Sequence, residues 1–484
     1  MLFNSLEFLI FFPIVTLLYF ILPHNFRWIL LLAASYVFYM FWRPIYIILI
    51  IVSTIIDYIA GRIMDNFEIG SRPRKLFLVF SLTSNLGILF LFKYFNFFAE
   101  SWALISGNNF NALALVLPMG ISFYTFQTLS YTIDVYRGHR ESERHLGYFA
   151  LYVTFFPQLV AGPIERSTKL LPELKKVNKY DYPRVVAGLK LMTWGFFKKL
   201  VIADNLAVAV NHVYGDVGNM SALTLLIATV FFAYQIYCDF SGYSDIAIGT
   251  AKIMGIDLME NFKRPYFAKS IKEFWSRWHI SLSTWFRDYL YIPLGGSRKS
   301  KVRTYINVFL VFLISGLWHG AAWTFVIWGA IHGFYQMYES ATFKIRNKIW
   351  QKSKLENTNI QFLVKWIFTM GIVLLSWVFF RANSVNDALT ILNSIFSETL
   401  NLSILSNIRS NIVATAIGPY RLIVVLAAII VLEINNLIEE KHSYGILDLF
   451  NKKPVFRWAI YYGIVFWIVI FGSFGQAEFI YFQF

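Results

Sequence analysis

Charged residues are scarce in this chain of 484 residues, where Asp, Glu, Lys and Arg together make up 15%. A soluble domain typically carries about 25% charged residues. Hydrophobic residues reach 57% and aromatic residues 19%. Many segments of roughly 15–20 residues carry almost no charge, which is the length that a helix needs to cross a bilayer core about 30 Å thick. The sequence therefore predicts an all-α, polytopic membrane protein and excludes an ordinary soluble domain.

Cysteine is nearly absent, and the sequence shows no internal repeats and no metal-binding motifs. The single cysteine, Cys238, excludes a disulfide within the chain, and we interpret it as a small buried apolar residue. The sequence shows no glycine-rich phosphate loop and no Cys/His spacing typical of a metal site, so we predict no bound metal or cofactor. The opening LEFLIFFPIVTLLYFIL lacks a basic start and an A-x-A end, and we expect it to be the first span rather than a signal peptide.

The net charge of +15 comes from Lys and Arg clusters between the apolar segments. In a soluble protein this charge would suggest nucleic acid as a partner, but Lys and Arg also accumulate in the cytoplasmic loops of membrane proteins. We therefore predict membrane lipids and no nucleic acid as partners, and place the N-terminus and the C-terminal tail outside the cytoplasm. We expect twelve spans, approximately at 5–22, 28–42, 45–61, 76–92, 113–133, 186–206, 221–238, 305–318, 323–338, 363–380, 422–437 and 457–474.

Two apolar segments do not fit simple spans. Residues 147–165 are flanked by basic loops on both sides, and residues 240–258 contain Asp245 and several glycines. Irregular backbone at membrane depth is stable only where protein covers it or where it lines a wet cavity. We therefore expect two re-entrant or surface-lying segments and a cavity within the bundle. The loops at 94–112 and 382–420 carry few basic residues and are expected outside.

Three of the eight histidines lie in or beside apolar segments. His319 lies in GLWHGAAWTF, where Gly316 and Gly320 would let a backbone or a substrate approach closely. Ionisable groups at membrane depth tend to mark reaction or transport paths, and a neutral imidazole is a suitable general base. We predict a catalytic role for His319. His332, on the next span, is a weaker candidate whose alternative interpretation is a satisfied core histidine.

The block 263–303 combines many Lys and Arg residues with tryptophans, and it contains the third histidine, His279. One interpretation is an amphipathic helix at the headgroup level. The other is the entrance for a phosphate-bearing cytosolic donor such as coenzyme A, because Arg binds phosphate oxygens and Trp stacks on bases. The second interpretation predicts a set of donor-binding residues: Arg277, Trp278, Arg287 and, beside His319, Trp318.

FWSRWHISLSTWFRDYLYIPLGG, followed by GLWHGAAWTFVIWGAIHG, resembles the membrane-bound O-acyltransferase family, and most closely its bacterial alginate O-acetyltransferase branch. The resemblance extends to MLFNSLEFLIFF and to residues 117–138, 155–166 and 239–249, and it covers most of the chain outside about 382–455. It implies one membrane-embedded acyltransferase domain over 1–484. The implied fold is a ring of about 11–12 transmembrane helices and re-entrant segments around a central funnel.

The same resemblance assigns the site. The family's characteristic histidine falls on His319, and its cytoplasmic-side partner position falls on His279. The implied donor substrate is acetyl-coenzyme A, and the implied location is the bacterial cytoplasmic membrane. The implied partners are an extracytoplasmic protein of the SGNH hydrolase type and a polysaccharide acceptor.

The tail at about 475–484 ends in EFIYFQF. Its F-x-Y-x-x-F pattern resembles the end of small partner peptides in teichoic acid D-alanylation, where the tyrosine is thought to carry the acyl group. By this resemblance Tyr481 would be an acyl carrier. The chemistry is reasonable, because a phenol with a pKa near 10 is a leaving group almost as good as a thiol near 8.5. The alternative is an aromatic anchor at the outer membrane interface.

The sequence thus predicts a membrane O-acetyltransferase that moves acetyl groups across the membrane to an extracytoplasmic polysaccharide, with His319, His279 and Tyr481 as catalytic residues. One alternative is transfer of D-alanine or another acyl group by the same fold. A second alternative, from a different class, is a transporter for a glycan precursor, although transporters tend to contain repeats, which this sequence lacks. The identity of the polymer and the role of 382–420 stay open at this point.

Overall fold

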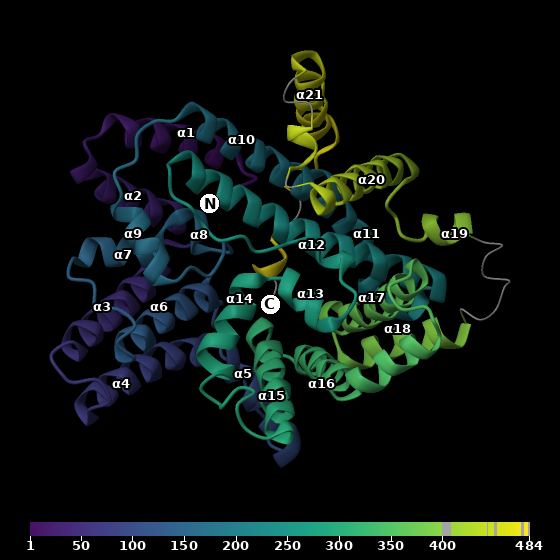
Figure 1. Ribbon diagram of the computed structural model, residues 1–484, viewed down its shortest axis with the longest axis horizontal. Helices are drawn as coiled ribbons and strands as arrows, with labels where there is room; N and C mark the ends of the chain where they lie inside the picture. The colour runs from purple at the N-terminus through teal and green to yellow at the C-terminus, as the bar shows by residue number, and fades with distance from the viewer. Residues whose placement is uncertain (399–407, 443, 450–452, 476–478, 483–484) are drawn as a thin grey trace. The chain divides into compact units, whose positions relative to one another are not determined.

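A computed structural model describes residues 1–398, 408–442, 444–449, 453–475 and 479–482 (Figure 1). The described residues form helices and loops, with no strand among them. The chain divides into two compact units: unit 1 comprises Met1–Met192 with Tyr243–Glu260, and unit 2 comprises Thr193–Gly242 with Asn261–Phe484. The expectation of a single acyltransferase domain over the whole chain stays a prediction.

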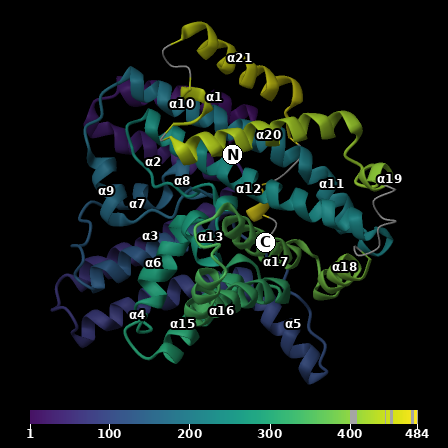
Figure 2. The same cartoon turned by 45° about the vertical axis from the view of Figure 1, so that its right-hand side comes forward.

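The helices of unit 1 follow one another along the first third of the chain. They are α1 Leu6–Ile21, α2 His24–Met40, η1 Pro44–Tyr46, α3 Ile47–Met64, α4 Arg72–Leu89, η2 Phe90–Tyr94, α5 Phe95–Ser106, α6 Ile121–Tyr136, α7 Leu146–Thr154, α8 Phe156–Leu159 and α9 Ser167–Lys175. Within this unit α3, α4 and α6 lie side by side in both views (Figures 1 and 2).

Two helices have residues in both units: α10 Tyr182–Phe196 and α12 Ala222–Ile253. Unit 2 contains the other elements. They are η3 Phe197–Ala203, α11 Asp204–Gly215, η4 Val217–Asn219, η5 Pro265–Phe267, α13 Ile271–Arg277, α14 Ile280–Phe286, η6 Arg287–Tyr291, α15 Lys301–His319, α16 Trp323–Lys352, α17 Asn359–Arg381, α18 Val385–Glu398, α19 Ile408–Val413, α20 Pro419–Lys441, η8 Ile446–Asp448, α21 Pro454–Phe471 and η9 Ile480–Phe482.

Each of the twelve predicted spans overlaps a helix, but the match is uneven, and residues 113–120 of the predicted span 113–133 precede α6 and are not helical. Seven helical segments of the described residues are long and apolar enough to cross a membrane: 44–64, 72–106, 222–253, 301–319, 359–381, 419–441 and 454–471. The other predicted spans fall on helices that are shorter, such as α1, or more polar, such as α16. The protein is therefore a multi-pass, all-α membrane protein, as the composition predicts.

The expected re-entrant segment at 240–258 is wrong, because α12 continues without a break to Ile253. The glycines that suggested irregular backbone instead permit close helix packing. In unit 2, a β-carbon on Gly242 would lie 2.7 Å from the carbonyl oxygen of Gly195 in α10. In unit 1, a β-carbon on Gly249 would lie 2.6 Å from the carbonyl oxygen of Gly188. Small residues at such contacts are typical of packed membrane helices.

The other segments that we predicted to have irregular backbone or to form loops have mixed outcomes. Residues 147–165 form α7, α8 and a buried turn, and their placement as a re-entrant or surface-lying segment stays a prediction. The expected loop at 94–112 is largely wrong, because η2 and α5 extend α4 as one helical run to Ser106. The expected loop at 382–420 contains α18 and α19, and its residues 399–407 lie outside the described residues.

Polar side chains are buried in unit 1 while large apolar ones face outward, which is the reverse of a soluble protein. Asp57 of α3 is fully buried and accepts hydrogen bonds from Ser81 (2.5 Å) and Asn85 (2.8 Å) of α4. On α1, by contrast, Leu6 and Leu17 are exposed. In lipid the helices gain nothing by burying leucine against each other, and they associate through polar contacts and close packing.

In unit 2, α15 and α16 form an antiparallel pair that both views show side by side (Figures 1 and 2). Gly316 and Gly329 face each other across this pair. A β-carbon on Gly329 would lie 2.3 Å from the carbonyl oxygen of Phe312. A β-carbon on Gly316 would lie 2.3 Å from the carbonyl oxygen of Phe325. The space that these glycines leave near the end of α15 is thus filled by α16, not by a substrate.

We predict that Gly329→Ala forces α15 and α16 apart and destabilises the protein by about 1–3 kcal/mol, the typical cost of overpacking. Gly371→Ala in α17 is the matched control, because no atom lies within 4 Å of a β-carbon placed there. The control should be neutral or more stable by about 0.5–1 kcal/mol, since alanine favours helices. Thermal unfolding in detergent, followed by tryptophan fluorescence, measures both. Equal midpoints for the two variants would contradict the packing argument.

Candidate active site

The end of the chain returns into unit 2 and is buried there. Phe479 and Ile480 are 1% and 2% exposed. The backbone N–H of Ile480 donates to the carboxylate of Asp239 in α12 (2.8 Å), and upstream the N–H of Ser473 donates to the carbonyl of Leu200 (3.0 Å). These contacts place the tail against α12 and η3.

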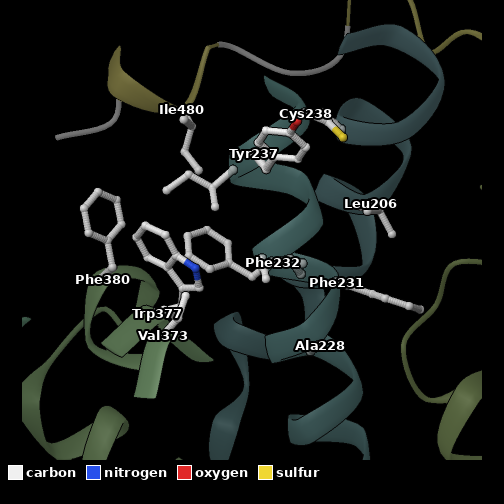
Figure 3. Packing of buried hydrophobic residues seen from close by; sticks show 14 of the residues in the cluster. Leu206, Ala228, Phe231, Phe232, Tyr237, Cys238, Val373, Trp377, Phe380 and Ile480 are labelled. Atoms are coloured by element: carbon white, nitrogen blue, oxygen red, sulfur yellow. The ribbon is translucent and has the colours of Figure 1, made fainter. Parts of the chain in front are cut away.

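Figure 3 shows how the side chain of Ile480 enters the apolar core of unit 2. It points toward Phe232 and Tyr237 of α12, and toward Trp377 and Phe380 of α17. An exposed interfacial anchor would instead keep its apolar groups on the outside. Phe479 and Ile480 are therefore buried in unit 2, and Ile480 is part of its apolar core.

Tyr481 follows directly in η9 and lies among aromatic rings. Its ring centroid is 4.5 Å from that of Phe240 and 5.6 Å from that of Phe479, with the latter pair stacked. Burial raises the pKa of Tyr481 above its usual value near 10, and the nearby charge of Asp239 acts in the same direction. The phenol is thus strongly held in its protonated form.

His319 is the last residue of α15, and it is 2% exposed. The helix ends there because Gly320 adopts an extended conformation before α16 begins. Three aromatic residues surround the imidazole: the ring centroids of Trp318 and Trp328 lie 4.9 Å away, and that of Phe380 lies 5.4 Å away. This aromatic surrounding gives the imidazole an apolar environment.

His279 lies between α13 and α14 in a left-handed conformation, with φ of 44°. Residues other than glycine adopt this conformation rarely, and where they do so it often marks a functional site. The side chain is fully buried, and its ring packs edge-on against Phe240 at 4.7 Å. His279 lies outside the candidate spans, and burial lowers its pKa from 6.5 to about 3.

The tautomer of His279 follows from its neighbour Asn261. The side-chain oxygen of Asn261 accepts the backbone N–H of Ser281 (3.2 Å), so this atom is an acceptor. The Nδ1 atom of His279 lies 3.2 Å from the same oxygen and must therefore be the protonated nitrogen. The lone pair of the neutral ring is consequently on Nε2, the nitrogen that could accept a proton.

The structure brings the three predicted catalytic residues together. The ring centroid of Tyr481 is 5.6 Å from that of His319 and 6.4 Å from that of His279, and the two histidine rings are 6.4 Å apart. His332 belongs to a different cluster, in which the indole N–H of Trp275 donates to its Nδ1 (3.2 Å). This contact agrees with the interpretation of His332 as a satisfied core histidine.

The predicted donor-binding arginines are both engaged by carboxylates of the chain. Arg277 pairs with Glu273 (2.9 Å) and with Glu440 of α20 (3.2 Å), and Arg287 pairs with its neighbour Asp288 (2.8 Å). Arg287 is largely exposed, at 60% of its side chain, whereas Arg277 is 19% exposed. A phosphate would have to compete with these carboxylates, so their role in donor binding stays a prediction.

The predicted tryptophans form walls of the site. Trp278 is 1% exposed and lies between the rings of Phe262 (5.0 Å) and Trp377 (5.1 Å). Trp318 contacts both histidine rings, at 6.1 Å from His279 and 4.9 Å from His319. Trp318 therefore borders the candidate site directly, whereas Trp278 supports it from the core.

Sequence reasoning missed a buried ionic cluster next to the tail. The ammonium of Lys199 lies 2.7 Å from Asp204 and 2.6 Å from Asp239, and all three side chains are at most 4% exposed. We refer to these three residues as the Lys199 cluster. The signal was present in the sequence, since all three are ionisable residues within or directly after predicted spans.

Comparison with known proteins identifies the family. The membrane-bound O-acyltransferase family, MBOAT, matches residues 139–381, which include His279, His319 and the Lys199 cluster. The chain is 41% identical to the probable alginate O-acetylase AlgI of Pseudomonas putida over 82% of this chain and 80% of that protein. The chain belongs to the membrane-bound O-acyltransferase family. The resemblance seen in the sequence motifs is thereby confirmed.

Other relatives of this acyltransferase carry related names. The chain is 36% identical to the peptidoglycan O-acetyltransferase of Helicobacter pylori over 81% of this chain and 79% of that protein. It is 31% identical to the teichoic acid D-alanyltransferase of Bacillus subtilis over 45% of this chain and 58% of that protein. The chain is therefore an acyltransferase, and the transporter alternative is set aside.

The buried, neutral state of His279 predicts a dependence of stability on pH. Unfolded His279 binds a proton below pH 6.5, whereas the folded ring stays neutral down to about 3. Because the unfolded state then binds more protons, stability falls as the pH falls from 6.5, by about 1.4 kcal/mol for each pH unit. His279→Asn removes this loss while tolerating the left-handed conformation.

We therefore expect the thermal midpoints of wild type and His279→Asn to run in parallel above pH 7 and to converge, or cross, between pH 6.5 and pH 5. The difference between the two proteins removes the effect of other titrating groups. Midpoints that stay parallel down to pH 5 would show that His279 is not held neutral in the folded protein.

Proposed function

We propose that this acyltransferase takes acetyl from acetyl-coenzyme A and delivers it to an extracytoplasmic polysaccharide, with Tyr481 as an intermediate carrier. The observation that carries the proposal is the position of the Tyr481 ring beside both His319 and His279. The acceptor class rests on the relatives named for alginate and peptidoglycan acetylation. The enzyme would lie in the bacterial cytoplasmic membrane, with its N-terminus and tail on the outer side.

In the first step, the phenolic oxygen of Tyr481 attacks the thioester carbonyl of the donor. His319 takes the phenolic proton, the new C–O bond forms, the C–S bond breaks, and the proton returns to the departing thiolate. The products are acetyl-Tyr481 and coenzyme A. A base is needed here because burial raises the pKa of Tyr481, so that little phenolate forms unaided.

In the second step, a hydroxyl group attacks the acetyl ester, and the phenol of Tyr481 is regenerated. An aryl ester is suited to this role because the phenol leaves more readily than a sugar or serine hydroxyl. The hydroxyl would belong to a partner protein of the SGNH hydrolase type, which then modifies the polysaccharide. His279, whose Nε2 carries a lone pair, would polarise the donor side of the site.

Donor binding would use the block 263–303, with Trp318 at the site and the arginines nearer the donor's phosphates. The pairing of Arg277 with Glu440 suggests that a phosphate displaces the carboxylate when the donor binds. No bound metal or cofactor takes part in this proposal, because the transferred group arrives already activated as a thioester.

Transfer of a different acyl group is the second candidate. It is favoured by the similarity to a protein named teichoic acid D-alanyltransferase, which covers 45% of this chain. Mass spectrometry of the tail separates the two candidates, because acetyl and alanyl additions differ in mass.

We predict that purified wild type incubated with acetyl-coenzyme A becomes acetylated on Tyr481, as measured by mass spectrometry of the C-terminal peptide. Tyr481→Phe should show no acetylation and no transfer. His319→Ala should lower the acetylation rate about 100-fold or more, the usual contribution of a general base.

His332→Gln is the matched control, because it replaces a buried histidine of the adjacent helix and keeps an acceptor for Trp275. This control should acetylate its tail at close to the wild-type rate. An unmodified tail in wild type, together with full transfer by Tyr481→Phe, would refute the carrier role.

A further inference from the structure

The Lys199 cluster is buried, and buried charges are costly. Lys199 and Asp204 fall in the predicted span 186–206, and Asp239 belongs to α12, which is long and apolar enough to cross a membrane. A buried ion pair gains little net stability, because removing both partners from water offsets their attraction. Ionisable groups in such positions usually serve a function, and the acyl transfer proposed above does not use them.

One ammonium in this cluster lies between two carboxyl groups. The two oxygens of Asp239 have different partners. Oδ1 lies 2.6 Å from the ammonium of Lys199, and Oδ2 accepts the backbone N–H of Ile480 at 2.8 Å. A hydrogen bond to an ionised acceptor is stronger than one between neutral groups. The tail thus contributes a donor to the negatively charged side of the cluster.

The segment that carries Lys199 also holds the tail farther upstream. The carbonyl of Leu200 accepts the N–H of Ser473 (3.0 Å), and the side-chain amide of Asn205 donates to the carbonyl of Phe471 (3.1 Å). Lys199 and Leu200 belong to η3, a π-helical segment. Such segments are rare and occur frequently at functional sites. The chain is therefore bonded on both sides of residues 476–478.

Ile480 is the residue immediately before Tyr481, so the bond to Asp239 fixes the backbone beside the phenol. We propose that Asp239 is a latch for the tail, in which Lys199 orients the carboxylate of Asp239, and Asp239 holds the tail so that the ring of Tyr481 stays beside His319. Asp239 is accordingly a positioning residue for acyl transfer. This inference rests on the carrier role of Tyr481 proposed above.

Two isosteric substitutions within the cluster test the latch. Asp239→Asn leaves one oxygen to serve two donors, the ammonium of Lys199 and the N–H of Ile480, so one contact is lost. Asp204→Asn is the matched control, because Asp204 pairs with Lys199, whereas Ile480 of the tail bonds to Asp239. Both variants replace one carboxyl group of the cluster by an amide of the same shape.

The first readout is hydrogen–deuterium exchange of the full-length protein in nanodiscs, analysed by mass spectrometry. We expect the C-terminal peptide that contains Ile480 to exchange about tenfold faster or more in Asp239→Asn, and at the wild-type rate in Asp204→Asn. Peptides from α15 and α16 should exchange equally in all proteins, which shows that the fold is intact.

The second readout is steady-state kinetics with acetyl-coenzyme A. Asp239→Asn should lower kcat by about tenfold or more and leave KM for the donor unchanged, because the tail and not the donor is displaced. Asp204→Asn should keep both constants close to wild type. A purely structural role would not produce this separation between the two variants.

A variant on the other side of the bond keeps the test valid if Asp239→Asn fails to fold. Ile480→Pro removes the donating N–H and leaves the Lys199 cluster intact, and proline is tolerated at the first position of a helical turn. Ile480→Val is its control, since it keeps the N–H and most of the buried side chain. Ile480→Pro should reproduce the exchange and kcat changes of Asp239→Asn.

Unchanged tail exchange in both Asp239→Asn and Ile480→Pro would overturn the latch. Faster tail exchange with unchanged kcat in these two variants would overturn the positioning role of Asp239. Failure of the proposed function is recognised separately, because Tyr481→Phe would then retain full transfer, whereas the exchange measurement does not depend on acylation.

Discussion

The hydrogen bond from the backbone of Ile480 to the carboxylate of Asp239 is the contact on which the candidate site depends. Asp239 can stay buried only because an ammonium and an amide N–H face its two oxygens. The tail can stay buried only because its backbone donors and apolar side chains find partners in α12 and η3. Each group lowers the cost of burying the other, so the buried position of the ionic cluster and that of the chain end depend on each other.

Close packing of α15 against α16 supplies the other half of the site. Gly316 and Gly329 allow these helices to approach until backbone atoms touch, and this approach brings His319 against the aromatic side chain of Trp328. His332 lies on the same helix pair but is bonded to the indole of Trp275. Two histidines of similar burial thus differ in their surroundings, since the ring of Tyr481 lies beside His319 and the indole of Trp275 bonds to His332.

The sequence predicted the membrane class, the helices and the family, because these follow from apolar length and from long, specific motifs. It also named His319, His279 and Tyr481, which the structure places within one cluster of rings. Their proximity could not be predicted, since no local pattern reports that a tail returns to the core of unit 2.

The failures of sequence reasoning have identifiable causes. Glycines at 242 and 249 read as irregular backbone, but in a membrane helix the same residues permit close contact with a neighbour. The Lys199 cluster was missed because the rule that intramembrane charges mark function was applied to histidine alone. Asn261 carried no signal, since its importance lies in orienting the ring of His279 across a turn.

Anchoring by the backbone has a consequence for a carrier residue. The backbone N–H groups of Ser473 and Ile480 make hydrogen bonds that fix the tail. These bonds do not involve the phenolic oxygen, so in the proposed first step the same anchors would hold the tail before and after acylation. A tethered nucleophile that is already oriented avoids most of the entropy cost of bringing two reactants together. The anchors hold the tail equally well before and after the acyl group is attached. They therefore do not drive the transfer forward. The direction of transfer then has to come from the leaving groups, from thioester to aryl ester to alkyl ester, which is the order of decreasing activation.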